Sequence, residues 1–167
     1  MFTTDPGYRD FVLSRQDGLR RAAVLMCGEQ AQAEDLLQEA LVALAERWES
    51  VDHPEAFVRR VIYRQRVSWW RRRRREVVVD AVPERGVGDG SEGRARDAEV
   101  REALRHLPQR QRAALVLRYF EDLTEAQTAE VMGVAVGTVK SLSHQGMARL
   151  REELSARQAD VEQEGVR

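Results

Sequence analysis

Apolar residues recur along the chain at the three- and four-residue spacing of an amphipathic helix, and strand-like alternation is nearly absent. In the first half this pattern predicts helices over about Tyr8–Met26 and Gln30–Glu49, and from Pro54 into the arginine string Arg71–Arg75. In the second half it predicts helical segments from about Arg96 to Leu107, on through Phe120, from Thr124 to Met132 and from Val136 to Ala156. The fold class that follows is all-α.

The composition changes between these two sets of helices. From about Asp80 to Gly93 the chain reads DAVPERGVGDGSEG, which is rich in glycine and acidic residues and has no periodic apolar face. Such a segment is typical of a flexible linker. We therefore expect two small helical domains at 1–78 and 96–157, a linker at 79–95, and a polar tail at 158–167 that frays.

The second domain contains the pattern of a helix-turn-helix. Thr124 and Gln127 form a T-x-x-Q capping box at the start of one helix. Gly133 then lies at the position where a residue with left-handed backbone conformation would end that helix. Val139 lies at the position where the next helix must pack against the first. This spacing is typical of a motif that places its second helix in the major groove of DNA.

A projection of that second helix separates an apolar face from a polar one. The apolar face carries Val139, Leu142, Gly146, Leu150 and Leu154. The opposite face carries groups able to reach phosphates and base edges, namely Thr138, Lys140, Ser141, His144 and Gln145. The alternative interpretation is an ordinary solvated face of a three-helix bundle.

Two faces also separate on the helices of the first domain. The second helix places Asp35, Glu39, Val42 and Glu46 opposite its apolar side, which could dock a basic partner helix or simply be solvated. The third helix has an apolar face and, opposite to it, a face of arginines and aromatic residues: Arg59, Arg60, Tyr63, Arg64, Arg66 and Trp70. Arginines that hold a backbone and rings that stack on bases are the chemistry of single-stranded DNA binding. The alternative is that Tyr63 or Trp70 packs under a neighbouring helix.

Charge and cysteine content exclude several classes of protein. The chain has 167 residues, of which 33% are charged, and a formal net charge of -1, so it does not coat nucleic acid by bulk charge. Cys27 is the only cysteine, which excludes an intrachain disulfide and a cysteine-rich zinc site. The N-terminus has no signal-like segment, and no run approaches the roughly 20 apolar residues of a membrane span. We therefore expect a cytoplasmic protein that does not enter a membrane.

The sequence also lacks the residues of an enzyme. The three histidines, His53, His106 and His144, are scattered and form neither a metal spacing nor a nucleophile–base arrangement. No phosphate-cradling glycine loop follows a strand. We expect no catalytic residue, no metal and no cofactor.

Three segments, in order, resemble the extracytoplasmic-function (ECF) sigma factors of bacterial RNA polymerase, and most closely actinobacterial members. AEDLLQEAL (Ala33–Leu41) resembles the family's helix that binds core polymerase. PEAFVRRVIYRQRVSWWRRRRRE (Pro54–Glu76) resembles its helix that reads the −10 element. LPQRQRAALVLRYFEDLTEAQTAEVMGVAVGTVKS (Leu107–Ser141) resembles its domain that reads the −35 element. Together they predict a non-enzymatic transcription-initiation factor that directs polymerase to promoters and promotes melting of the −10 element.

The resemblance implies specific contacts. Asp35, Leu36, Gln38 and Glu39, continued by Val42 and Glu46, match the surface that grips the clamp helices of the polymerase β′ subunit. The loop Glu49–Pro54, with Ser50, Asp52 and His53, matches the segment that captures a flipped −10 base, and Arg59–Arg71 would hold the opened strand. The polar face from Thr138 to Gln145 matches the −35 reader, and the β flap is a further partner. The free protein is expected to be a monomer.

The chain departs from the family at the −35 reader. Many relatives have serine where this chain has Ala135, and they carry more arginine where it has Leu142, His144 and Gln145. The sequence leaves open the strength of −35 binding, the promoter motif, and whether an anti-sigma factor binds. Two alternatives are a stand-alone dimeric helix-turn-helix regulator, which leaves the first domain unexplained, and a helical adaptor that binds only protein.

Overall fold

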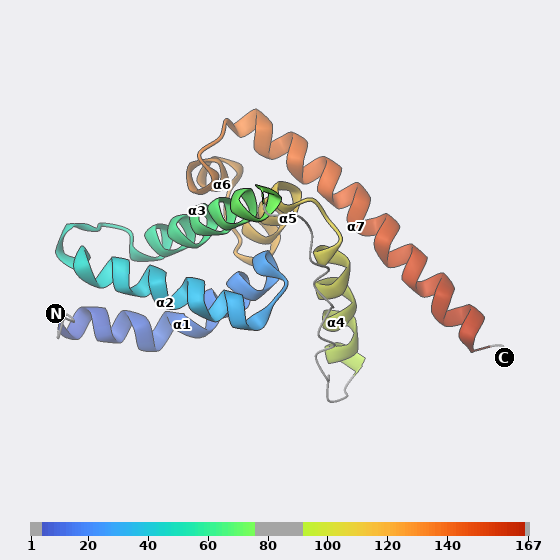
Figure 1. The fold of residues 1–167 in the computed structure, drawn as a ribbon, viewed down its shortest axis with the longest axis horizontal. Helices are drawn as coiled ribbons and strands as arrows, with labels where there is room; N and C mark the ends of the chain where they lie inside the picture. Colours follow the sequence, from blue (N-terminus) through green and yellow to red (C-terminus); the bar gives the residue numbers. More distant parts are fainter. Residues whose placement is uncertain (1–4, 76–91, 166–167) are drawn as a thin grey trace.

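The computed structural model describes residues 5–75 and 92–165, with side chains over 5–68 and 95–165. Within these ranges the regular elements are all helical, as the sequence predicts (Figure 1). They are α1 (Pro6–Cys27), α2 (Gln30–Glu46), the 3₁₀ turn η1 (Trp48–Ser50), α3 (Pro54–Arg75), α4 (Glu92–Arg105), α5 (Gln109–Leu115), the π-helical turn η2 (Val116–Phe120), α6 (Glu125–Met132) and α7 (Val136–Glu164). The described ranges hold no helix long and apolar enough to cross a membrane.

Helices α1, α2 and α3 form the N-terminal domain. They share an apolar core that includes Leu37, Leu44 and Ile62, each nearly or fully withdrawn from solvent. The turn between α1 and α2 is set by Gly28, which has φ 75° and donates its backbone N–H to the carbonyl of Val24. Glycine adopts this left-handed conformation without the penalty that a Cβ would bring, so α1 ends here.

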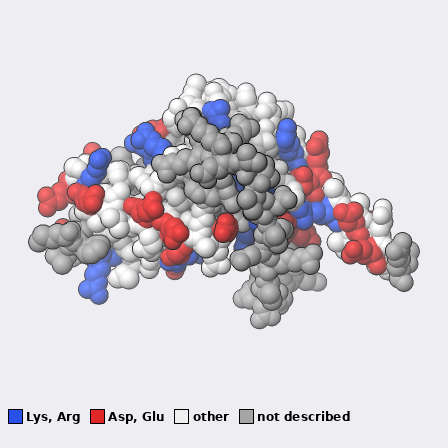
Figure 2. Space-filling model, in the orientation of Figure 1, with Lys and Arg blue, Asp and Glu red and all other residues white. Residues whose placement is uncertain are grey.

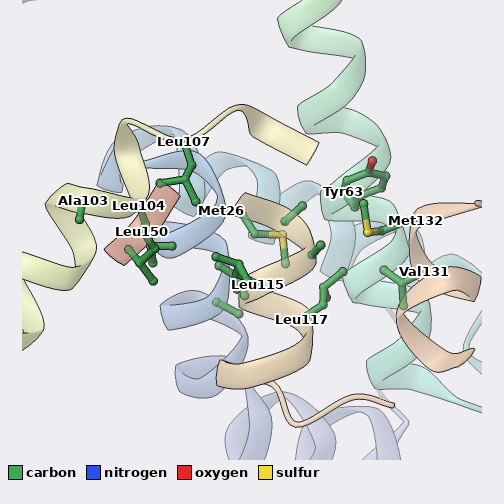
Figure 3. Packing of buried hydrophobic residues seen from close by; sticks show 14 residues of the cluster. Met26, Tyr63, Ala103, Leu104, Leu107, Leu115, Leu117, Val131, Met132 and Leu150 are labelled. Atoms are coloured by element: carbon green, nitrogen blue, oxygen red, sulfur yellow. The ribbon is translucent and has the colours of Figure 1, made fainter. Parts of the chain in front are cut away.

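Helices α5, α6 and α7, with η2 between the first two, form the C-terminal domain, and α4 packs along α7. The centre of this domain is the apolar run that includes Leu115 and Leu117 (Figure 3). In η2 the N–H of Glu121 donates to the carbonyl of Val116 over 3.0 Å, which is the wider turn of a π-helix. Tyr119 and Phe120, at the end of this turn, are about half exposed.

The helix-turn-helix is built as the sequence predicts. The Thr124 hydroxyl accepts from the N–H of Gln127, and the Gln127 side chain accepts from the N–H of Thr124, so the capping box is complete. Gly133 ends α6 with φ 66°. Val139 is fully buried where α7 crosses α6. These contacts fix the N-terminal half of α7 as the exposed second helix of the motif.

Three boundaries differ from the sequence-based expectation. The second helix was expected to reach Glu49, but α2 ends at Glu46 and the turn η1 follows it. The prediction that the last helix ends near Ala156 is wrong, because α7 continues to Glu164. Its final turns are rich in glutamate, glutamine, alanine and arginine, which favour a helix without tertiary contacts. Of the expected linker 79–95, residues 79–91 lie outside the described ranges, and α4 begins at Glu92.

The two domains pack against each other. One apolar cluster contains Met26 of α1 and Tyr63 of α3 together with Met132 of α6 and Leu115 of α5 (Figure 3). Helix α3 lies against α6, and α1 contacts α4, α5 and η2. The C-terminal domain therefore covers part of the α3 surface that the sequence assigns to DNA.

Candidate nucleic-acid interface

The acidic face of α2 is open to solvent. Asp35, Gln38, Glu39, Val42 and Glu46 are all exposed and follow one another along the helix. Leu36, which the resemblance places on the same surface, is only 7% exposed and belongs to the N-terminal core. Leu36 therefore lies on the apolar side of α2, and the exposed face consists of the other five residues. A partner that binds this face of α2 would contact its carboxylates and the side chain of Val42 between them.

The loop before α3 is also accessible. Ser50, Asp52 and His53 are exposed around the end of η1 and the start of α3. On α3 itself, Arg64 is exposed as well. The side chains of Trp70 and Arg71 lie outside the described residues.

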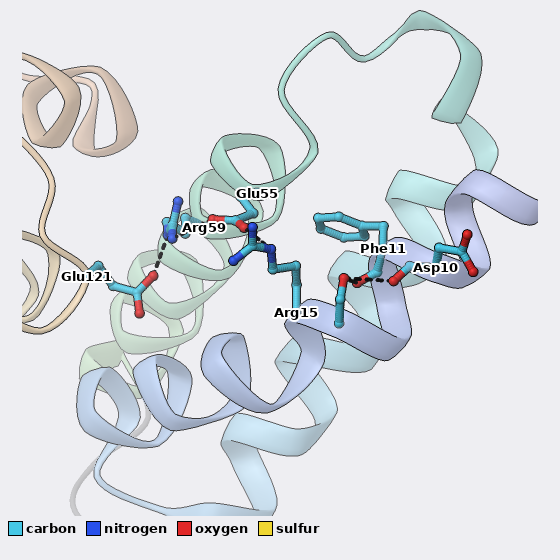
Figure 4. A network of polar contacts seen from close by, with 7 residues as sticks. Asp10, Phe11, Arg15, Glu55, Arg59 and Glu121 are labelled. Carbon is cyan, nitrogen blue, oxygen red and sulfur yellow. Dashed lines mark hydrogen bonds and ion pairs between the residues drawn. The ribbon is translucent and has the colours of Figure 1, made fainter.

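The first two arginines of α3 are engaged in ion pairs. Arg59 donates through Nε to Glu121 of the C-terminal domain over 2.5 Å and through Nη2 to Glu55 over 2.9 Å (Figure 4). Glu55 also accepts from Arg15 of α1, so one chain of ion pairs joins three parts of the molecule. Arg60 donates to Glu130 of α6 over 3.1 Å. Sequence reasoning missed Glu121 and Glu130, because no local pattern says which acidic residues will face α3.

Tyr63, which the sequence places on the arginine face of α3, is buried in this arrangement. Tyr63 does point away from the N-terminal core, but only 6% of it is exposed because α6 packs over it with Met132 (Figure 3). This corresponds to the alternative in which the ring packs under a neighbouring helix. A helical projection identifies the side of α3 on which Tyr63 lies, but not the domain that covers that side.

Two buried arginines close the junction at the C-terminus of α1. Arg66 of α3 donates to the carbonyl of Cys27 over 3.4 Å and to Gln32 over 3.1 Å. Arg112 of α5 donates to the carbonyl of Met26 over 3.3 Å, and to two carbonyls of its own domain. Cations suit the partial negative charge of a helix C-terminus. Sequence reasoning missed Arg112; its place directly before the apolar run from Ala113 to Leu117 is the signal that could have marked it as buried.

Burial at this junction changes the ionisation of its groups. Desolvation, together with the neighbouring positive charge of Arg66, lowers the pKa of Arg112 to about 10. Desolvation also raises the pKa of the Cys27 thiol to about 11, so this thiol stays protonated at neutral pH. The junction is therefore buried and polar, and the burial of the Arg112 charge in it is unfavourable. The protonated Cys27 thiol is unreactive.

The polar face of α7 is accessible. Lys140, Ser141, His144 and Gln145 are exposed, and Thr138 is half-buried. Lys140 lies 3.8 Å from Glu125 of α6, and Gln145 accepts from Gln111 over 3.3 Å. Lys140 and Gln145 are themselves exposed, so these side chains can exchange the two contacts for an external partner.

Ala135 leaves the N-terminus of α7 without a side-chain cap. It has the extended backbone of an N-cap residue, with ψ 152°, but no side chain accepts from the first turn. An Ala135→Ser substitution should stabilise the domain by about 1 kcal/mol, because the hydroxyl can accept from the N–H of Thr138. Thermal unfolding followed by circular dichroism measures this gain. Ala148→Ser, at an exposed interior position of α7, is the control and should lose about 0.5 kcal/mol. Equal effects of the two substitutions would contradict the missing-cap interpretation.

The surface carries mixed charge. On the face in Figure 2, acidic and basic side chains are interspersed. Among the described residues, no three histidine, cysteine, aspartate or glutamate side chains gather in a way that could hold a metal ion. On that face, the described side chains form no large field of one sign.

Both domains match models of known protein families. Residues 11–76 match the family model "Sigma-70 region 2", and residues 97–150 match "Sigma-70, region 4". The chain is 39% identical over 158 residues to the RNA polymerase sigma-E factor of Streptomyces coelicolor, covering 92% of this chain and 89% of the relative. It is 32% identical over 148 residues to the ECF RNA polymerase sigma factor EcfG of Rhodopseudomonas palustris, covering 85% and 82%.

A solved structure shares the fold. The sigma factor RpoE of Bartonella quintana, crystallised with the anti-sigma factor NepR, superimposes with a TM-score of 0.76 at 24% identity, covering 90% of this chain and 98% of that one. The two matched regions correspond to the two helical domains, and the relatives are matched over nearly their whole length. The predicted resemblance is confirmed: the chain belongs to the ECF group of sigma-70 factors, non-catalytic proteins that bind core RNA polymerase and promoter DNA and initiate transcription.

Proposed function

We propose that this sigma factor binds core polymerase through the exposed face of α2, against the clamp helices of the β′ subunit. The single observation that carries the proposal is the acidic row of Asp35, Glu39 and Glu46, which stays open to solvent within region 2 while other surfaces of that region are covered. Complementary charge on a partner increases the rate and the specificity of such an association. Val42, 44% exposed, adds an apolar contact among the carboxylates.

The loop before α3 and the arginine face of α3 then bind the melted −10 strand. Ser50, Asp52 and His53 supply polar groups beside the site where a flipped base would be held, and Arg64 supplies an exposed cation. Arg59, Arg60 and Tyr63 complete the face once the C-terminal domain moves away. Trapping of unpaired bases shifts the promoter from duplex toward the open complex, because bound single strands cannot re-anneal.

The C-terminal domain binds the polymerase β flap and the −35 element. The exposed side chains at the start of α7, from Lys140 to Gln145, support major-groove contacts. With both domains bound to polymerase, the chain between them supplies a high effective concentration of each domain at its site. We expect the free protein to be a monomer. An anti-sigma factor is a further candidate partner, since the Bartonella quintana relative was crystallised with one.

Abortive transcription from a promoter library tests the proposal. Purified protein with core polymerase should give discrete start sites that share upstream motifs. Arg64→Ala should reduce open-complex formation by about tenfold while core binding stays within twofold, because one exposed phosphate contact is lost. Arg21→Ala, an exposed arginine of α1, is the control and should leave both unchanged.

The outcomes separate the alternatives. If core polymerase is bound but no transcript appears, the adaptor alternative is favoured and the promoter contacts are wrong. If Arg64→Ala and Arg21→Ala have the same effect on open-complex formation, α3 does not hold the −10 strand through Arg64.

A further inference from the structure

Helix α7 carries two glycines on opposite faces, Gly137 in its first turn and Gly146 nine residues later. With about 3.6 residues per turn, nine residues correspond to two and a half turns, so the two glycines face in opposite directions. Glycine is unfavourable in a helix, because it loses more backbone freedom on folding than any other residue. A glycine kept within a helix is therefore expected to have a local reason.

Packing against α5 explains Gly146. A Cβ built at Gly146 would lie 3.2 Å from Cγ of Leu115 and 3.3 Å from the carbonyl oxygen of Gln111, which is tighter than most side-chain contacts. Helix α7 crosses α5 at this point, and the missing side chain lets the two helices approach each other. On this face of α7, glycine allows close contact with a neighbouring helix.

The part of the chain that the structure describes gives no such reason for Gly137. No atom of that part lies within 4 Å of a Cβ built at Gly137. Gly133 also has open space around it, but its φ of 66° at the end of α6 requires glycine, whereas the φ of Gly137 is outside the left-handed region. An alanine at position 137 would fit and would favour the helix. The free protein therefore has room for a side chain at this position and carries none.

Gly137 lies on the face of α7 that is proposed to read the −35 element. Lys140, Ser141 and His144 follow it three, four and seven residues later, which is the spacing of one helical face, and all three are exposed. In a helix-turn-helix, the N-terminal residues of the second helix contact base edges in the major groove. A side chain at Gly137 would extend into the space between the first turn of α7 and the DNA. Gly137 thus has on its outer side the geometry that Gly146 has on the inner side, with DNA in place of α5.

We propose that Gly137 sets how closely α7 approaches the −35 element. The missing side chain lets the first turn of α7 lie against the DNA, so that Lys140 and Ser141 reach phosphates and base edges. The inference rests on the proposed −35 binding by α7 and adds to it the residue that determines the depth of insertion. Gly137 acts as a positioning residue, and a side chain placed there should raise the stability of the protein while it weakens promoter binding.

The test uses the full chain assembled with core polymerase. The probe is a labelled duplex of the strongest promoter recovered from the library, compared with the same duplex after its upstream motif is scrambled. Gly137→Ala should raise the melting temperature of the free protein by about 1–2 °C, because alanine favours the helix and meets no neighbour. The same variant should bind the intact promoter about tenfold more weakly, because an added methyl group in a close-packed contact forces the partners apart. Its affinity for the scrambled promoter should equal that of the wild type.

The size of the side chain provides a second measurement. Leucine is also a good helix former, so Gly137→Leu should not lower the melting temperature. It should weaken binding to the intact promoter further, by about 100-fold, because a larger group holds α7 farther from the DNA. Gly18→Ala in α1 is the matched control, since the nearest atom to a Cβ built there is Nη2 of Arg21 at 3.9 Å. It should raise the melting temperature by a similar amount and leave promoter binding unchanged.

Three results would overturn the inference. The first is unchanged affinity of Gly137→Ala for the intact promoter. The second is a lower melting temperature of Gly137→Ala, because the fold itself would then require the glycine. The third is an equal loss on the intact and the scrambled promoter, because the effect would then lie outside the −35 contact. Failure of the proposed function is recognised separately, by wild-type protein that binds the two promoters equally well.

Discussion

Reversal of charge on α2, in the variant Asp35→Arg/Glu39→Arg, should lower the affinity for core polymerase by about 100-fold. Two exposed carboxylates of the proposed polymerase contact become two repelling arginines, and loss of such contacts typically costs about 1–3 kcal/mol each. Both residues are exposed on a stable helix, so the melting temperature of the free protein should change little. Titration of labelled sigma factor with core polymerase measures the affinity.

The matched control reverses two exposed carboxylates far along the chain, in Glu152→Arg/Glu162→Arg on α7. It alters the net charge by the same amount and should leave core binding within about twofold, because exposed charges beyond a Debye length of about 10 Å are screened. Equal losses in both variants would mean that overall charge, and not the α2 face, governs the association. Full binding by the α2 variant would remove this face from the polymerase contact.

The local rules of helix geometry explain how much of the fold could be predicted. Gly28 and Gly133 adopt left-handed conformations at the predicted helix ends, and Thr124 and Gln127 form the predicted capping box. Each of these features depends on residues within a few positions of one another. The helix-turn-helix could therefore be predicted from the chain alone.

Contacts between the domains could not be predicted in this way. Arg59, Tyr63 and Arg112 contact residues that lie tens of positions away in the sequence, across the segment that separates the domains. The projection of α3 separates Ile62 from Tyr63, but both sides are covered, one by α1 and α2 and the other by α6. It does not separate Arg66, which is buried against the turn between α1 and α2. A charged side chain such as Arg112 becomes buried only because three carbonyls converge on it, and a linear pattern does not reveal that convergence.

Packing in the core of the N-terminal domain holds α2 in position and so orients its exposed acidic face. Leu37 is fully buried in the core that α2 shares with α1 and α3, two residues along the chain from the exposed Asp35 and Glu39. Leu37→Ala should reduce the free energy of unfolding by about 3 kcal/mol, because the lost side chain leaves a cavity that close-packed neighbours fill only in part. Chemical denaturation followed by circular dichroism measures the loss.

Leu13→Ala provides the same substitution at a position of α1 that is 63% exposed. It should change the free energy of unfolding by no more than about 0.5 kcal/mol, since little apolar area leaves a packed environment. Leu37→Ala should also weaken core binding, because a loosened α2 no longer presents its carboxylates in a fixed row. If Leu37→Ala and Leu13→Ala destabilise the protein equally, α2 does not pack through Leu37, and the exposed side of the helix would have to be reassigned together with its proposed polymerase contacts.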